Sequence, residues 1–190
     1  MKAYKTRIKL DIEEEVERTI LLPINLSFKK LHELILVLFN IIESKKYNFI
    51  LEDINLEIHE TGSIKRDIID SKYELIDKYF KALPAIRYNN GTWKFALTIS
   101  KDYYEVKYPE IIEFKGKYNP SHKINTMDKF SRTLKLMDRQ IEIHNDLLLE
   151  ETLTSLQEKT MVLFDIPYAI ENNKFVLLKE EGTLNKYIHD

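Results

Sequence analysis

The chain has 190 residues, 44% hydrophobic and 32% charged, a composition typical of one globular domain and not of a disordered or fibrous chain. Lys and Arg number 29 against 31 Asp and Glu, so the net charge of -2 supplies no overall attraction to nucleic acid or to an anionic membrane. The absence of cysteine excludes disulfides, thiolate catalysis and cysteine-based zinc sites, and indicates the reducing cytoplasm.

The first part of the chain predicts two strands and a helix. Residues 3–12, AYKTRIKLDI, alternate apolar or β-prone residues with mostly polar ones, which is the period of a half-buried strand. VERTILL at 16–22 predicts a second strand that ends at Pro23. Ser27 is a candidate N-cap for the helix FKKLHELILVLFNII at 28–42, whose apolar residues fall at helical spacing. We expect one broad face of this helix to lie against a sheet.

The middle of the chain predicts further strands and a short helix. YNFILED at 47–53 and INLEIHE at 54–60 are β-prone, and ETGSIKRD at 60–67 has turn composition. SKYELIDKYFKAL at 71–83 shows helical spacing before Pro84. YYEVKYPEIIEFKGKY at 103–118 is again β-prone, with an interruption at Pro109.

RYNNGTWKF at 87–95 holds the single tryptophan of the chain and predicts a hairpin. A two-residue type I′ turn at Asn90-Gly91 would place Tyr88 opposite Trp93 and Ile86 opposite Phe95. All the large side chains would then share one face, and the tryptophan would stabilise the hairpin without any ligand.

The last third changes character. Phe130, Leu134, Met137 and Ile141 repeat at helical spacing, LEETLTSLQEKTMVLF at 149–164 predicts another helix, and a short strand can follow Asn172-Asn173. We therefore predict an α+β fold: an antiparallel or mixed sheet of about five to six strands, packed by the N-terminal ββα helix, with a mainly helical C-terminal third. The predicted division is a domain at 1–124 and a helical extension at 125–190 on the same core.

Three stretches, VERTILLPINLSFKKLHELILVLFN, YNFI and RYNNGTW, resemble the plasmid pRiA4b ORF-3-like family in order over roughly residues 3 to 120. The resemblance implies an α+β domain and an association with plasmids and mobile elements, and it implies no established reaction. Matching positions are Arg18, Pro23, Leu31, His32, Tyr47, Phe49, Tyr88, Gly91 and Trp93.

Other positions depart from the family pattern. Glu17 stands where a tryptophan precedes the arginine, Asn40-Ile41 replaces Gly-Trp, and Lys45 replaces a strand histidine. In the hairpin, Asn89 and Thr92 stand where the family has acids. If relatives use those carboxylates in chemistry, this chain lacks them.

Arg18, His32, Tyr88 and Trp93 are the candidate residues for a pocket, because they match the family pattern together. His32 borders the apolar stripe of its helix, so a semi-buried histidine satisfied by a hydrogen bond is the simpler interpretation. His59, His122, His144 and His189 lack the spacing of metal ligands, and the four glycines cannot form a phosphate-binding loop. We predict no metal and no cofactor.

A local basic patch is the alternative binding site. KGKYNPSHK at 115–123 sets Lys115, Lys117 and Lys123 beside Tyr118, a combination suited to phosphate contacts and base stacking, and SKKYNF at 44–49 is a possible second patch. A solvated loop and strand edge guarded by lysines explains the same pattern.

The functional prediction is a cytoplasmic, non-enzymatic interaction or accessory domain with an unidentified protein partner and no membrane span. The first alternative is a nucleic-acid-binding accessory protein of a plasmid or mobile element. The weaker alternative is an enzyme with a pocket near His32, Arg18 and Trp93, because catalytic groups can meet in space without any sequence motif.

Overall fold

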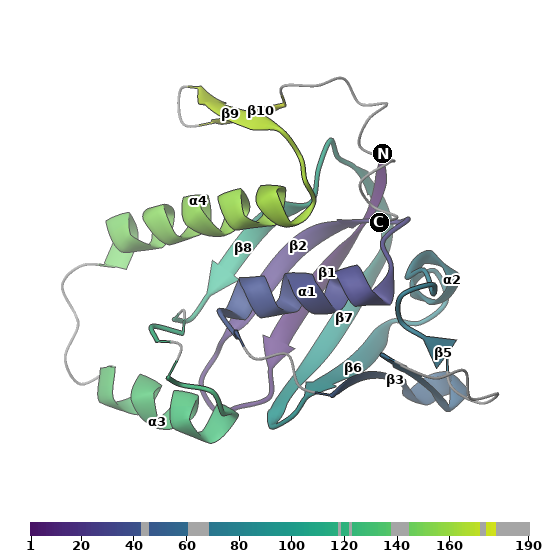
Figure 1. Cartoon of the computed structure of the whole chain (residues 1–190), viewed down its shortest axis with the longest axis horizontal. Coiled ribbons are helices and arrows are strands. Elements are labelled where there is room, and N and C mark those ends of the chain that lie inside the picture. Colours follow the sequence, from purple (N-terminus) through teal and green to yellow (C-terminus); the bar gives the residue numbers. More distant parts are fainter. Residues whose placement is uncertain are drawn as a thin grey trace.

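The computed structural model describes residues 1–42, 46–60, 69–117, 119–121, 123–137, 145–171 and 174–177. An eight-stranded sheet forms the centre, in the order β5-β4-β3-β6-β7-β1-β2-β8 (Figure 1). Its neighbours pair antiparallel except β4 and β5, which are parallel. The strands are β1 (Lys2–Leu10), β2 (Glu17–Pro23), β3 (Tyr47–Leu51), β4 (Leu56–His59), β5 (Ile69–Asp70), β6 (Ala85–Asn90), β7 (Trp93–Glu105) and β8 (Glu110–Lys115).

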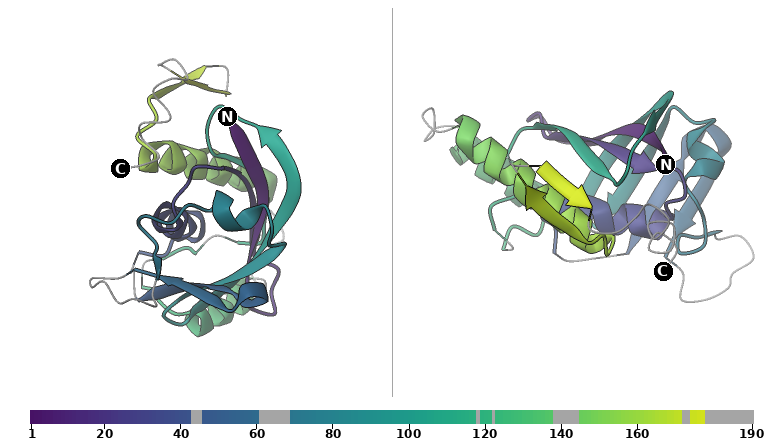
Figure 2. Two further views of the ribbon diagram at one scale, coloured as in Figure 1. Left: turned by 90° about the vertical axis from the view of Figure 1, so that its right-hand side faces the viewer. Right: turned by 90° about the horizontal axis from the view of Figure 1, so that it is seen from above.

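The helices lie on one side of this sheet, which curves around α1 (Figure 2). They are α1 (Phe28–Phe39), α2 (Asp77–Phe80), α3 (Met127–Met137) and α4 (Asn145–Leu163), with a 3-10 turn at Glu52–Ile54. A separate two-stranded sheet joins β9 (Tyr168–Glu171) to β10 (Lys174–Leu177). The opposite face of the main sheet carries none of the described helices (Figure 2).

The predicted ββα opening is confirmed, including its cap. Ser27 has extended backbone angles and its hydroxyl accepts a hydrogen bond from the Lys30 amide at 3.2 Å, as an N-cap should. The helix ends at Asn40, whose φ of 53° places it in the left-handed region. The capping residues Ser27 and Asn40 therefore define where α1 begins and ends.

The predicted helix at 71–83 is much shorter in the structure, because backbone carbonyls in its first half bind the first turn of α1 instead. The carbonyls of Ser71 and Glu74 accept hydrogen bonds from the amides of Lys29 and Phe28, at 2.9 and 3.0 Å. Those amides lie in the first turn of α1 and have no partner within the helix. Residues 71–75 consequently stay extended or turned, and α2 is confined to Asp77–Phe80.

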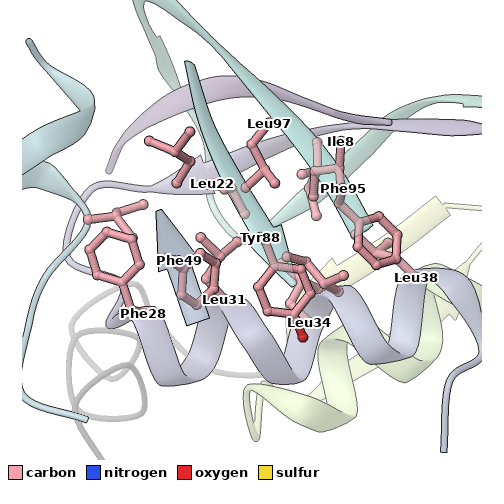
Figure 3. Packing of buried hydrophobic residues seen from close by; sticks show 14 of the residues in the cluster. Ile8, Leu22, Phe28, Leu31, Leu34, Leu38, Phe49, Tyr88, Phe95 and Leu97 are labelled. Carbon is pink, nitrogen blue, oxygen red and sulfur yellow. The ribbon is translucent and has the colours of Figure 1, made fainter. Parts of the chain in front are cut away.

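One core cluster joins α1 to the sheet. Leu31, Leu34 and Leu38 of α1 point at the concave face of the strands, which presents Tyr88, Phe95 and Leu97 among others (Figure 3). The same cluster contains side chains from α3 and from the end of α4: Phe130, Leu134, Met161 and Phe164. Side chains after residue 124 thus share the core of the first part, and the division into a domain at 1–124 and an extension at 125–190 stays a prediction.

Two predictions about the sheet need correction. The main sheet has eight strands where about five to six were expected, because β8 and the short β5 extend its edges. The C-terminal third is helical in α3 and α4 and then forms the strands β9 and β10, so it is only partly helical. The pairing of the main sheet is mixed, which is one of the two patterns expected. The turn at 60–67 lies almost wholly outside the described residues.

The hairpin forms, but the predicted register is wrong. Asn90 pairs with Trp93 and Tyr88 with Phe95, so the loop is Gly91-Thr92 and starts one residue later than expected. Gly91 has a φ of 61°, the left-handed angle that a type II′ turn requires at this first loop position. Asn90 is instead the last strand residue and is fully buried, which keeps it out of the loop.

Candidate functional site

His32 lies in a buried aromatic cluster between α1 and the strands β3 and β6. It is 3% exposed, its Nδ1 is 2.6 Å from the Tyr88 hydroxyl, and its ring stacks on Tyr47 with centroids 3.6 Å apart. Tyr47 in turn shares a hydrogen bond of 2.8 Å with the Ser71 hydroxyl. The helix thus places the histidine against the phenol rings of Tyr47 and Tyr88.

Burial keeps these groups uncharged near neutral pH. Loss of hydration lowers the pKa of His32 to about 4, with a smaller contribution from the positive charge of Lys29. Burial also raises the pKa of Tyr47 to about 12 and raises the pKa of Tyr88. A histidine with so low a pKa is a weak proton acceptor at pH 7, which makes it poorly suited to general base catalysis.

Arg18 is fully buried on β2 and acts as a clamp on the backbone. Its guanidinium donates hydrogen bonds to the carbonyls of Glu17 at 2.7 Å, Lys115 at 2.6 Å, Lys117 at 3.1 Å and Leu38 at 3.3 Å. These carbonyls belong to β2, to the end of β8 with the loop after it, and to the last turn of α1. One side chain therefore ties several separate segments together.

Aromatic rings and a close backbone approach complete the surroundings of Arg18. The guanidinium carbon lies 3.3 Å from the centroid of the Phe114 ring and 5.0 Å from that of Phe39, both in cation–π range. Gly116 follows, with a φ of 73°, and a Cβ added there would lie 2.1 Å from the Glu15 carbonyl oxygen. No other residue fits this crossing of β8 past the β2 segment.

A pair of asparagines joins the same loop to the end of α1. The Asn40 amide donates to the Asn119 carbonyl at 2.7 Å, and the Asn119 amide donates back to the Asn40 carbonyl at 3.3 Å. The family pattern has Gly-Trp where this chain has Asn40-Ile41, so sequence comparison alone did not single out this pair. The two hydrogen bonds hold Asn119 against the end of the helix.

Trp93 stands apart from both clusters. Its ring is 1% exposed and lies 5.9 Å from Phe130 of α3, measured between centroids, and its indole Nε1 is buried without a hydrogen-bond partner. The predicted Tyr88–Trp93 cross-strand pair is not formed, because Tyr88 faces Phe95 at 5.6 Å between ring centroids. The tryptophan instead packs the hairpin tip against α3.

The predicted pocket residues therefore occupy three different surroundings. His32 and Leu38, whose carbonyl binds Arg18, are six residues apart on α1, which separates them by about 9 Å along the helix axis. The ring contact of Trp93 is with Phe130 of α3. Within the described ranges no group of three His, Cys, Asp or Glu side chains is arranged to hold a metal ion.

Lys115, the first residue of the alternative nucleic-acid patch, is surrounded by acids. Its ammonium lies 3.0 Å from Glu17, 3.5 Å from Glu113 and 3.7 Å from Glu15. The hydrogen bond to Glu17 raises the pKa of Lys115. Of the other members, Lys123 is exposed and Tyr118 lies outside the described residues. The three carboxylates compensate the positive charge of Lys115, so its attraction for a phosphate is weak.

A different basic surface lies on the outer face of the sheet. Lys5, Arg7 and Lys9 alternate along β1 and point away from the helices, next to Lys94 of β7 and Arg87 of β6. The alternation in AYKTRIKLDI already indicates this basic surface, since the apolar residues of the strand lie on its inner face. The charges at the intervening positions define the outer one.

The model of the family described as "Plasmid pRiA4b ORF-3-like protein" matches residues 2–167. The chain belongs to the plasmid pRiA4b ORF-3-like family. No curated protein matches. Among solved structures, the crystal structure of a protein of unknown function, MM3350, from Methanosarcina mazei Go1 is similar, with a TM-score of 0.60 and 19% sequence identity over 78% of this chain and 87% of that one. This likeness shows the shared fold.

The family match reaches beyond the resemblance noted in the sequence, since it continues through α3 and α4 to residue 167. In this pRiA4b ORF-3-like chain, the family-pattern residues Arg18, His32, Tyr88 and Trp93 all lie inside the core. None of the helices in the described part of the chain is long and apolar enough to cross a membrane.

Proposed function

We propose that this pRiA4b ORF-3-like chain is a non-enzymatic interaction domain, an accessory protein that acts in the cytoplasm by binding. The observation that carries the proposal is the burial of Arg18, His32, Tyr88 and Trp93, none of which is more than 3% exposed. A catalytic group must touch its substrate, whereas these side chains contact backbone carbonyls and aromatic rings. Their surroundings support a role in holding the scaffold together.

The association of the family with plasmids and mobile elements supports an accessory role in such an element. A protein partner is part of the proposal. The nucleic-acid alternative gains support from the basic outer face of the sheet and loses support at residues 115–123, where three glutamates surround Lys115.

Turnover assays test the proposal against the enzymatic alternative. The purified chain is incubated with phosphate esters, carboxylic esters, peptides and nucleic acids, beside the variants His32→Gln and His59→Gln. His59 is a matched control because it is a partly exposed histidine on β4. We expect no turnover above background for any of the three proteins.

Turnover that disappears in His32→Gln, persists in His59→Gln and is accompanied by unchanged thermal unfolding would overturn the proposal. A corresponding loss in Arg18→Lys, again with the fold intact, would point to the arginine clamp as the reactive centre.

A further inference from the structure

The outer face of the sheet presents positive charge over three adjacent strands. We name Lys5, Arg7, Lys9, Arg87 and Lys94 the outer basic face. The register places Lys9 opposite Ala96, and Ala96 opposite Arg87, in one row across β1, β7 and β6. Arg7 lies in the next row, opposite Thr98. The members are exposed, except Lys5, which is partly buried.

Few of these charges have an acid within ion-pair distance, although Glu17 of β2 lies opposite Lys9 in the register. Arg87 lies 3.2 Å from Glu52, but Lys5, Arg7, Lys9 and Lys94 form no ion pair within the described ranges. Acids flank the face on two sides: Glu17 and Glu113 on the β2 and β8 side, both beside Lys115, and Glu57 on β4, beside His59. The face is therefore a basic strip between two mixed margins, on a chain whose net charge is -2.

The side chains between the cations are small. Ala85, Ala96 and Thr98 occupy the centre of the face, and no aromatic or large aliphatic side chain lies among them on β1, β6 or β7. Protein interfaces depend on buried aromatic and apolar anchors, and stable membrane attachment needs apolar insertion in addition to charge. Single-stranded nucleic acid is held largely by stacking on aromatic rings. The centre of this face offers none of these features; the exposed Tyr104 lies opposite Ala3 beyond the Lys5 end, and Ile50 of β3 lies opposite Arg87.

We propose that the outer basic face binds the phosphate backbone of double-stranded nucleic acid without reading its sequence. A duplex carries one negative charge for every 1.7 Å or so of its axis, so charge alone can supply the attraction. This inference rests on the proposed non-enzymatic binding role and develops its nucleic-acid alternative, with a duplex in place of a protein partner.

The dimensions of the face suit a short stretch of duplex. Lys5, Arg7 and Lys9 extend over about 14 Å along one strand, and each neighbouring strand adds about 4.8 Å of width. Four or five phosphates can be contacted at once on this area. The logarithm of the binding constant should then fall with the logarithm of salt concentration with a slope of about −4, which corresponds to a loss of affinity of roughly 250-fold between 50 and 200 mM salt.

The test uses fluorescently labelled duplex DNA of arbitrary sequence, titrated with the full chain at several salt concentrations. The variant Arg7→Thr/Lys9→Thr/Lys94→Thr removes three charges while keeping strand-forming residues at exposed positions. We expect its affinity at 50 mM salt to fall at least tenfold and its salt slope to shrink by about 3. Thermal unfolding of each protein verifies that the fold is kept.

A matched control removes as many charges elsewhere: Lys72→Thr/Lys81→Thr/Lys129→Thr, at exposed positions near α2 and on α3. A second comparison, Lys117→Thr/Lys123→Thr, tests the loop at 115–123. Both should bind duplex DNA nearly as well as the unaltered chain.

Several results would overturn the inference. These are no salt-dependent binding at micromolar protein, equal losses in the control variants, or binding restricted to single strands or to vesicles containing anionic lipid. Failure here would leave the non-enzymatic role standing, since that role is decided by the turnover assays.

Discussion

Burial of the His32 imidazole makes the stability of the fold depend on pH. The folded-state pKa of about 4 lies below the value of 6.5 of an exposed histidine. Between these two pH values His32 is protonated in the unfolded chain and neutral in the folded chain. The contribution to stability is complete above pH 6.5 and is lost as the pH falls toward 4. The full effect is about 3 kcal/mol in the free energy of unfolding.

Urea unfolding of the chain and of His32→Gln at pH 7.0, 5.5 and 4.5 measures this effect. The glutamine cannot take up a proton, so the stability difference between the two proteins should narrow steadily as the pH falls. Carboxylates that titrate in the same range affect both proteins alike. A constant difference across the three pH values would contradict the prediction.

Replacement of Arg18 should destabilise the fold strongly. Arg18→Met leaves the carbonyls of Leu38, Lys115 and Lys117 without their buried donor, and we expect a loss of about 3–5 kcal/mol in the free energy of unfolding. Arg18→Lys should recover little, because one ammonium cannot reach several carbonyls in different directions.

Arg7→Met is the matched control, on the neighbouring strand but exposed on the outer face. Its change should stay within about 0.5 kcal/mol. Comparable losses for Arg7 and Arg18, measured by urea unfolding, would show that the clamp contributes nothing particular to stability.

Among the elements, β8 is an edge strand of the main sheet, and a side chain of α4 covers part of its open edge. The Gln157 amide donates to the Pro109 carbonyl at 2.8 Å, and its oxygen accepts from the Ile111 amide at 3.0 Å, so it replaces the next strand of the sheet. Gln157→Leu should cost about 1–3 kcal/mol by leaving both backbone groups unpaired.

Hydrogen exchange is the direct measurement, because the Ile111 amide should exchange faster in Gln157→Leu than in the unaltered chain. Thr154→Leu, at an exposed position of the same helix, should leave that rate unchanged. Equal protection of Ile111 in both variants would mean that Gln157 does not protect the edge.

Elements governed by local chemistry could be predicted from the sequence, and those governed by distant contacts could not. Ser27 and the spacing of the apolar residues after it define α1 by themselves. The helix expected at 71–83 is shortened because Ser71 and Glu74 supply carbonyls to α1. The hairpin register was missed because burial of Asn90 outweighs its preference for a turn.

The candidate site shows the same division. The family resemblance singled out Arg18, His32, Tyr88 and Trp93 as a group, but it carried no information on their burial or on their different surroundings. Alternation along a strand assigns residues to two faces without saying which face a helix covers. The outer basic face therefore became recognisable only with the order of the strands.

For the whole molecule, we expect a single cooperative unfolding transition. Phe130, Leu134, Met161 and Phe164 share a core cluster with the sheet and contribute about 6–12 kcal/mol together by burial, which is comparable to the total stability of 5–15 kcal/mol of an ordinary domain. A chain ending at residue 124 should therefore fail to fold stably.

Trp93 is the natural reporter, because it is the single tryptophan and lies against Phe130. Its fluorescence and the far-ultraviolet circular dichroism should change at the same urea concentration in the full chain. The truncated chain should show emission of an exposed indole even without urea. A cooperative transition with buried-indole emission in residues 1–124 would instead establish an independent domain.

The curved sheet separates two kinds of constraint on substitution. On its inner side, the arginine clamp and the histidine cluster allow few replacements, because each side chain is fitted to fixed partners. On its outer side, positions such as Arg7, Lys9 and Lys94 contribute charge without a buried contact, so they can be exchanged at little cost to folding. The same scaffold can accordingly be adapted to a different partner by replacing the outward-facing residues of three strands.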